Sequence, residues 1–242
     1  MVKKTAFGIS ATVAFVIAAA AIWLLIGGGE VLAKSLIINP HYDRRVSQFG
    51  QLPVRAGDTV FLGDSLTDFG PWQDLFPQTR TKNRGVVGDD TAGVLARLHE
   101  VTAGKPGQVF LLIGTNDLSF GVDEDEIVAN VEDIISTIDT ESPDTEIFVQ
   151  SVLPRAQSYR ERVESLNRSL RSAVSEKATW IELHAHFLDD DGSIIDEYSN
   201  DELHLFGKAY LVWQDILDPY VNTHTSPSAQ QQGVGTQGVV TT

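Results

Sequence analysis

Four short apolar runs, separated by helical patterns, constrain the fold of this chain more than any other feature. The runs cover residues 59–62, 108–113, 146–152 and 180–183. Near-continuous apolar runs of this length are typical of strands that are covered on both faces. Apolar residues at helical spacing lie between and after the runs, most clearly over 127–138, 163–174 and 210–217. This alternation predicts an α/β fold with a parallel sheet and helices on both faces.

Polar motifs lie where the predicted strands end. Gly63-Asp64-Ser65-Leu66 follows the first run, and Gly114-Thr115-Asn116-Asp117 follows the second. A glycine-containing segment over 83–89 lies between them, and Asp201-Glu202-Leu203-His204 lies near the C-terminal end. Because functional groups of parallel sheets gather at the carboxyl ends of the strands, we expect these loops to lie close together.

The residue types in these loops suit nucleophilic catalysis. A serine hydrolase needs a nucleophile, a base and an acid that orients the base, and Ser65, His204 and Asp201 supply them. It also needs hydrogen-bond donors for the developing oxyanion, which the N–H groups of Ser65 and Gly85 and the amide of Asn116 can provide. Each motif alone is common as a plain turn, so the prediction depends on the combination.

The order and spacing of these motifs resemble the GDSL esterases, also called SGNH hydrolases. That family has a Ser in Gly-Asp-Ser-Leu, a Gly, an Asn in Gly-x-Asn-Asp and an Asp-x-x-His, and the blocks occur here in order from Gly63 to His204. The segments 91–98 and 204–213 are also similar to the family. The resemblance covers most of the predicted domain.

The resemblance implies a three-layer α/β/α fold of the flavodoxin-like SGNH type and hydrolysis of esters through an acyl-enzyme. It implies Ser65 as nucleophile, His204 as base and Asp201 as the acid that orients it. Gly85 and Asn116 would complete the oxyanion hole with the Ser65 N–H. Neither a metal nor an organic cofactor is implied. The expected partner is a small-molecule, lipid or glycan ester.

Three residues depart from the family pattern. Family members often have Gly where Val87 and Glu202 stand, and Asn where Phe206 stands. Val87 stiffens the loop beside the expected oxyanion hole, Glu202 adds a carboxylate between the two triad positions, and Phe206 replaces a polar contact by an apolar one. None of these changes removes a catalytic group, but each can alter the choice of substrate.

The segment from Thr5 to Gly29 carries no charged residue. As a helix it is roughly 37 Å long, enough to cross a hydrocarbon core of about 30 Å. Lys3 and Lys4 precede it, which predicts a cytoplasmic N-terminus and an extracytoplasmic domain. The length favours an uncleaved signal anchor at the cell membrane, whereas cleavage near Ala33 would give a secreted protein.

Composition sets further limits. The net charge is −15 and the chain has no cysteine, which argues against a nucleic-acid partner and excludes disulfides and thiolate chemistry. The charge distribution also favours substrates that are neutral or cationic near the ester. The expected organisation is an anchor over 1–30, a tether over 31–56, a hydrolase domain over 57–222 and a disordered tail over 223–242.

Two other motifs are weaker candidates for chemistry. Asp189-Asp190-Asp191-Gly192 lacks the carboxylates that an EF-hand requires at its first and twelfth positions, so we interpret it as a solvated turn. His184 and His186 have no evident third metal ligand. Asp64 and Asp117 flank the reactive groups and are expected to hold loops through backbone N–H groups.

Two other functions remain open from the sequence alone. An acyltransferase could use the same triad and pass the acyl group to an alcohol. A surface binding module could retain the scaffold without catalysis.

Overall fold

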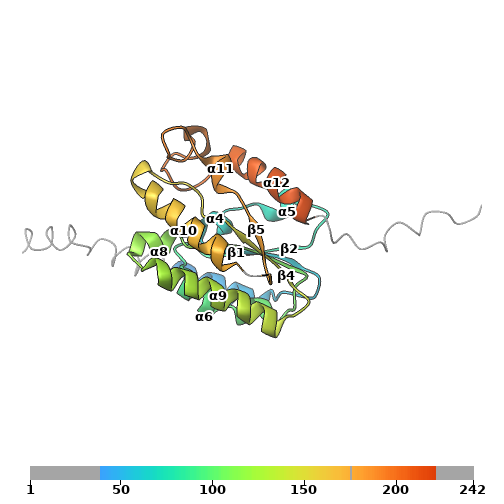
Figure 1. Cartoon of the computed structure of the whole chain (residues 1–242). Coiled ribbons are helices and arrows are strands. Elements are labelled where there is room, and N and C mark those ends of the chain that lie inside the picture. The colour runs from blue at the N-terminus through green and yellow to red at the C-terminus, as the bar shows by residue number, and fades with distance from the viewer. Residues whose placement is uncertain (1–38, 175, 222–242) are drawn as a thin grey trace, which may run out of the picture. The chain divides into compact units, whose positions relative to one another are not determined.

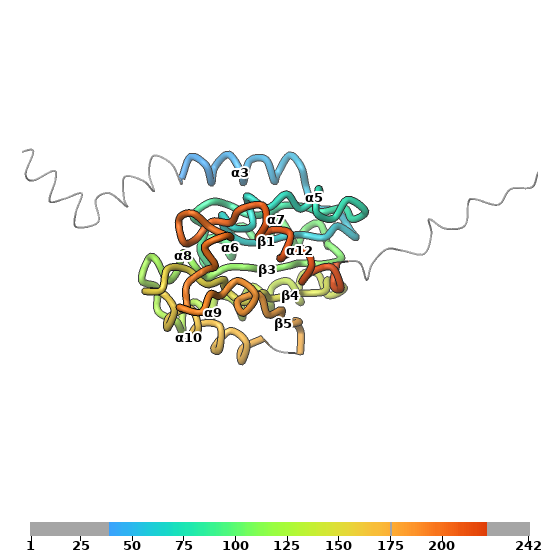
Figure 2. The backbone as a smooth tube through the Cα atoms, turned by 90° about the horizontal axis from the view of Figure 1, so that it is seen from above, coloured from blue at the N-terminus to red at the C-terminus, as the bar shows by residue number. Residues whose placement is uncertain are grey.

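Five parallel strands form the centre of the computed structural model, which describes residues 39–174 and 176–221. Their order in the sheet is β2-β1-β3-β4-β5, and every neighbouring pair is parallel. Their bounds are β1 (Thr59–Gly63), β2 (Thr81–Gly85), β3 (Gln108–Leu112), β4 (Glu146–Gln150) and β5 (Thr179–Ile181). Figure 2 shows β1, β3, β4 and β5 side by side in that order. The strand order reverses direction between β1 and β3, and such a switch point is where α/β sheets bind ligands.

Helices cover both faces of the sheet, as Figure 1 shows for α6 and α9 on one side and α5 and α12 on the other. The first group comprises α6 (Thr91–Ala96), α7 (His99–Thr102), α9 (Glu124–Glu141) and α10 (Arg160–Ala173). The second comprises α4 (Ser65–Asp68), α5 (Trp72–Leu75), α11 (His184–Phe187) and α12 (Gly207–Val221). The remaining elements are α3 (Asn39–Gln51), α8 (Thr115–Phe120), η3 (Gln157–Tyr159) and η4 (Asp196–Tyr198). The predicted three-layer α/β/α fold is therefore confirmed.

The two cores differ in the side chains that fill them. Successive strand residues point to opposite faces, so Val60 and Leu62 of β1 enter one core while Phe61 enters the other. Among the described residues, the fully buried side chains of the first core are Val, Leu and Ile. In the second, Phe61, Phe110 and Phe148 are neighbours across β1, β3 and β4, with ring centroids 5.3 and 4.5 Å apart. This stacked row fixes the register of the three strands whose carboxyl ends carry the loops of interest.

The apolar runs over 108–113 and 146–152 contain β3 and β4, and the runs over 59–62 and 180–183 overlap β1 and β5. The apolar pattern does not predict β2, because this strand consists of Thr-Lys-Asn-Arg-Gly and lies at the edge of the sheet. An edge strand pairs on one side only and can be polar.

The chain before β1 also contributes to the core. Residues 39–51 form α3, within the segment expected to be a tether, and the side chains of Phe49 and Val54 are buried. Phe49 lies 4.5 Å from the Arg84 guanidinium, measured to the ring centroid. The core therefore includes residues that precede position 57.

The expected anchor over 1–30 and the expected tail over 223–242 lie outside the described residues. Within 39–174 and 176–221, none of the helices has the length and apolar character that crossing a bilayer requires.

Candidate active site

Ser65 is the first residue of α4, directly after β1. The Asp64 side chain caps this short helix, because its Oδ1 accepts a hydrogen bond from the Leu66 N–H at 2.9 Å. The turn is tight: a Cβ atom on Gly63 would lie 2.2 Å from the Leu112 carbonyl oxygen of β3. Glycine at position 63 therefore allows the close approach that places Ser65 at the switch point between β1 and β3.

The structure brings Ser65, His204 and Asp201 together, although Ser65 and His204 are 139 residues apart. Ser65 Oγ lies 3.0 Å from His204 Nε2, and His204 Nδ1 lies 2.6 Å from Asp201 Oδ2. A carboxylate can only accept, so Nδ1 carries the hydrogen and Nε2 is left to accept from the Ser65 hydroxyl. This is the tautomer that a base needs.

The Asp201 carboxylate is held in its ionised form. Partial burial raises its pKa, but hydrogen bonds from the His204 ring and backbone outweigh this effect and lower the pKa to about 2. Its Oδ1 accepts from the N–H groups of Leu203 and His204, at 3.1 and 2.7 Å. The side chain that orients the imidazole is thus itself fixed by the local backbone.

Two of the three predicted oxyanion donors, Asn116 and Gly85, differ in their hydrogen bonds. Asn116 follows β3, and its Nδ2 donates to the Asp89 carbonyl oxygen at 2.8 Å, which uses one of its two amide hydrogens. The N–H of Gly85 already donates to Asn83 Oδ1 at 2.9 Å, and Gly85 is buried. A Cβ at position 85 would lie 2.1 Å from the Asp68 nitrogen. Gly85 therefore packs β2 against the end of α4, and its donor is occupied.

Gly88 is a second candidate for the glycine donor, and the sequence motifs do not single it out. It lies three residues after Gly85 in the same loop, is half-buried and has a φ of 76°, which favours glycine. Its neighbour Asp89 is the residue whose carbonyl oxygen contacts Asn116. The N–H of Gly88 has no partner among the hydrogen bonds of the described residues. The run Gly85-Val86-Val87-Gly88 contains two glycines, which differ in the φ of Gly88 and in the hydrogen bond of the Gly85 N–H to Asn83.

Three buried carboxyl groups lie beneath this site. Burial raises the pKa of Asp64 to about 7, and raises that of Asp89 to about 6 although the Arg97 guanidinium lowers it. Arg97 Nε lies 2.7 Å from Asp89 Oδ2, and its Nη2 donates to the Gly63 carbonyl oxygen. Asp117, whose pKa burial also raises, accepts from both the N–H and the hydroxyl of Thr91. These contacts tie the loops after β1, β2 and β3 together, which is the role expected for Asp64 and Asp117.

The weaker sequence motifs form no second reactive centre. Asp191 Oδ1 accepts from the N–H and hydroxyl of Ser193, which closes the turn around Gly192. In the part of the chain that the structure describes, no group of three or more His, Asp and Glu side chains is placed to hold a metal ion.

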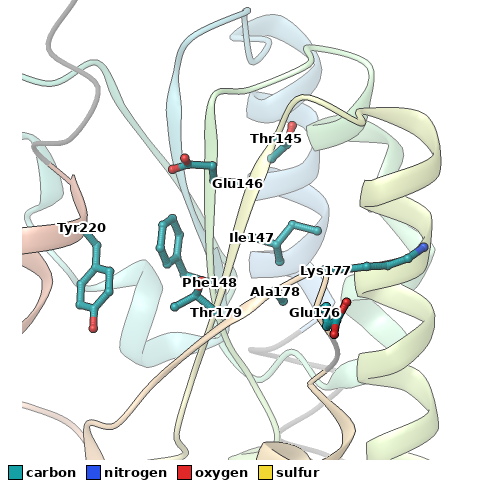
Figure 3. A pocket seen from close by; sticks show the side chains of 9 residues that line it. All are labelled: Thr145, Glu146, Ile147, Phe148, Glu176, Lys177, Ala178, Thr179 and Tyr220. Atoms are coloured by element: carbon teal, nitrogen blue, oxygen red, sulfur yellow. The ribbon is translucent and has the colours of Figure 1, made fainter.

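A hollow that is separate from Ser65 lies at the amino ends of β4 and β5 (Figure 3). Glu146 and Phe148 of β4, Thr179 of β5 and Tyr220 of α12 contribute to its lining. Because the strands are parallel, their amino ends lie together on the side of the sheet away from their carboxyl ends. The hollow is therefore far from Ser65, which follows the carboxyl end of β1.

Comparison with known proteins places this fold and site in a class. Residues 61–211 match the model of the GDSL-like Lipase/Acylhydrolase family. A platelet-activating factor acetylhydrolase IB subunit alpha2 from Gallus gallus is 30% identical over 164 residues, which covers 63% of this chain and 71% of the relative. The corresponding Homo sapiens protein is 28% identical over 183 residues, covering 69% and 79%.

Solved structures share the fold of this chain. A structure from Streptococcus pneumonia, described as a platelet activating factor, has a TM-score of 0.71 and 25% identity, and covers 84% of this chain and 99% of that one. The acetyl xylan esterase AlAXEase shares the fold, with a TM-score of 0.61, 16% identity and coverage of 68% and 99%. The class is that of ester-hydrolysing enzymes. More particularly, the chain belongs to the GDSL-like lipase/acylhydrolase family.

Proposed function

We propose that this protein is a serine esterase that cleaves carboxylic esters through an acyl-enzyme on Ser65. The observation that carries the proposal is the continuous chain of contacts from Ser65 Oγ to His204 Nε2 and from His204 Nδ1 to Asp201 Oδ2. The three side chains have the residue types, the order of contact and the tautomer that nucleophilic acyl transfer requires.

In the first half of the reaction, Ser65 Oγ attacks the ester carbonyl carbon while His204 Nε2 takes the hydroxyl proton. The tetrahedral intermediate then collapses, and His204 gives that proton to the alcohol oxygen as the carbon–oxygen bond breaks. Asp201 stabilises the imidazolium that exists between these two steps. In the second half, water attacks the acyl-Ser65 ester with the same proton transfers, and the carboxylic acid leaves.

The negative charge on the carbonyl oxygen needs donors at the moment it develops. Ser65 and Asn116 supply two of them in the proposed mechanism. Ser65 opens α4, where the first N–H groups of a helix have no intrahelical acceptor, and one Asn116 amide hydrogen is not used by Asp89. Gly88 takes the third place in preference to Gly85, because the Gly85 N–H is buried against Asn83.

The substrate of the proposed enzyme is a small-molecule, lipid or glycan ester that is neutral or cationic near the reacting bond. The support is the chain's charge of −15, since an acidic surface repels anionic substrates. A comparison of kcat/KM for neutral, cationic and anionic acetate esters tests this part. A strong preference for the anionic ester would contradict it.

The proposed enzyme is tethered to the cell membrane through residues 5–29, with the catalytic domain outside the cytoplasm. The support is the uncharged length of this segment and the position of Lys3 and Lys4 before it. Cell fractionation combined with added protease tests the arrangement. The expected result is a membrane-bound chain whose domain is digested from outside, and a chain confined to the cytosol would contradict it.

The catalytic proposal is tested with a fluorophosphonate probe, which reacts covalently with activated serines. We expect the full chain to be labelled on Ser65 and the Ser65→Ala variant to remain unlabelled. Ser172 provides a control, because it is exposed on α10 and its hydroxyl donates to the Arg168 carbonyl oxygen, so Ser172→Ala should still label. Equal labelling of the wild type and Ser65→Ala would overturn the proposal.

A further inference from the structure

Phe69 is an exposed aromatic side chain directly beside the proposed base. Its ring centroid lies 5.5 Å from that of His204, with the two planes inclined by 50°. The residue is 53% exposed, although Ser65, Leu66 and Thr67 of α4 are buried. Phe69 also follows Ser65 by four residues, and its N–H donates to the Ser65 carbonyl oxygen at 3.0 Å. Residues four apart lie on the same side of a helical turn, so the ring and the nucleophile share a face.

The backbone that carries Phe69 is held in place. Asn83 Nδ2 contacts the carbonyl oxygens of Thr67, Asp68 and Gly70, at 2.9, 2.9 and 3.2 Å. Trp72 Nε1 donates to the same Thr67 oxygen at 2.8 Å. These contacts fix the residues on both sides of Phe69 while its ring remains half open to solvent. An apolar ring held in this way offers a preorganised surface to a ligand.

The chemistry of the proposed reaction decides which part of an ester reaches this ring. His204 Nε2 must return its proton to the alcohol oxygen, so that oxygen lies next to the imidazole when the ester bond breaks. The carbonyl oxygen is directed to the donors, one of which is the Asn116 amide. The alcohol portion therefore leaves the reacting carbon on the His204 side, where Phe69 is found.

We infer that Phe69 is a specificity-determining residue that contacts the alcohol portion of the substrate and favours esters of apolar alkyl or aryl alcohols. The inference rests on the proposed acyl-enzyme mechanism and assigns one subsite of it. A substrate whose alcohol covers the ring removes apolar surface from water on both sides, and this gain is absent for a short alcohol.

The test uses acetate esters of ethanol, hexanol and benzyl alcohol, all of which give the same acetyl-enzyme. For Phe69→Ala in the full chain, we expect kcat/KM for hexyl and benzyl acetate to fall at least about ten-fold relative to ethyl acetate. Deacylation, measured after the burst with p-nitrophenyl acetate, should stay within about two-fold of the wild type, because the alcohol has already left. Phe69→Leu should retain most of the preference.

Leu52→Ala is the matched control, since Leu52 is 65% exposed and lies before β1, and it should change none of these values. An equal loss for all three esters with slower deacylation and a shifted pH profile would mean that Phe69 positions His204, and would overturn the inference. Unchanged alcohol preference would overturn it as well. Undiminished ester turnover by Ser65→Ala would instead contradict the mechanism on which the inference rests.

Discussion

Aspartates occur in two regions of the site, an exposed rim that contains Asp201 and a buried floor that contains Asp64 and Asp89. The pKa values of the aspartates shift in opposite directions in the two regions. At the rim, the Asp201 side chain is 49% exposed, and hydrogen bonds from His204 bring its pKa to about 2 against the opposing effect of burial. In the floor, Asp64 is 1% exposed, and burial raises its pKa to about 7. An aspartate side chain is therefore kept ionised at the rim, whereas burial opposes its ionisation in the floor.

The two regions therefore have different roles, since the rim contacts the proposed base and the floor holds the loops in place. The Asp201 carboxylate contacts the imidazole that faces Ser65, so its charge acts on the proposed base. Asp64 caps the helix that begins at Ser65, and Asp89 pairs with Arg97, which in turn holds the Gly63 carbonyl oxygen. Changes at the rim should alter rates, whereas changes in the floor should alter stability.

The largest expected effect is that of Asp201→Asn at the rim. An amide nitrogen in place of Oδ2 cannot accept from His204 Nδ1, which favours the wrong tautomer of the base. We expect kcat to fall by about 10³ to 10⁴-fold with little change in the thermal midpoint. Steady-state kinetics and thermal unfolding on the same sample check this pair of results. A loss of less than ten-fold would show that Asp201 does not orient the base.

Next in size is Arg97→Met in the floor. The change leaves Asp89 buried without its partner, and breaking a buried ion pair lowers the free energy of unfolding by about 3–5 kcal/mol. Denaturant unfolding measures the loss. The control is Arg171→Met, because Arg171 is exposed in the last turn of α10, and its effect should stay within about 0.5 kcal/mol. Equal effects of the two variants would remove the distinction between floor and surface.

Asp64→Asn should change how the free energy of unfolding depends on pH. The pKa of Asp64 is about 7 in the folded protein and near 3.8 when unfolded, so the folded state binds the proton more tightly. Its contribution to stability is present below pH about 4 and is lost as the pH rises to about 7. Asparagine does not ionise, so the free energy of unfolding of Asp64→Asn should rise relative to wild type across this window, by a few kcal/mol, and then level off.

Unfolding curves of both proteins at pH 4, 5.5, 7 and 8 give this difference directly. Parallel pH profiles would mean that the Asp64 carboxyl does not bind its proton more tightly in the folded protein.

The smallest expected effect is that of Glu202→Gly at the rim. Glu202 has a φ of 59°, in the left-handed region, at a position where the resemblance to GDSL esterases leads us to expect glycine. Glycine removes the backbone strain but loses more entropy on folding, so the net gain in unfolding free energy is at most about 1 kcal/mol. The thermal midpoint should rise slightly and kcat/KM should change less than about two-fold. A lower midpoint would show that the Glu202 side chain stabilises the loop.

The sequence predicts those elements of the fold whose own residues carry a recognisable pattern. The strands β1, β3 and β4 are apolar because both of their faces are buried, so their composition identifies them. The polar edge strand β2 carries no such signal. Likewise, Gly85 and Gly88 look equivalent in the sequence, and only the hydrogen bond of Gly85 to Asn83 and the φ of Gly88 distinguish them.

Contacts between residues far apart in the chain, such as that of Ser65 with His204, are harder to predict. No local pattern relates residues 139 positions apart, and the motifs alone brought them into one hypothesis. Their separation of 3.0 Å follows from the parallel sheet, which gathers the strand ends, and from the loop before α12, which returns His204 to α4. The exposure of Phe69 beside His204 depends on the same packing, which sequence patterns do not describe.

The most direct test of the central claim is mass spectrometry of the full chain after a rapid acid quench during ester hydrolysis. We expect part of the protein to gain the mass of one acyl group on the peptide that contains Ser65, and we expect Ser65→Ala to show neither the adduct nor turnover. Continued turnover by Ser65→Ala, or an acyl group on another residue that persists in that variant, would contradict the account.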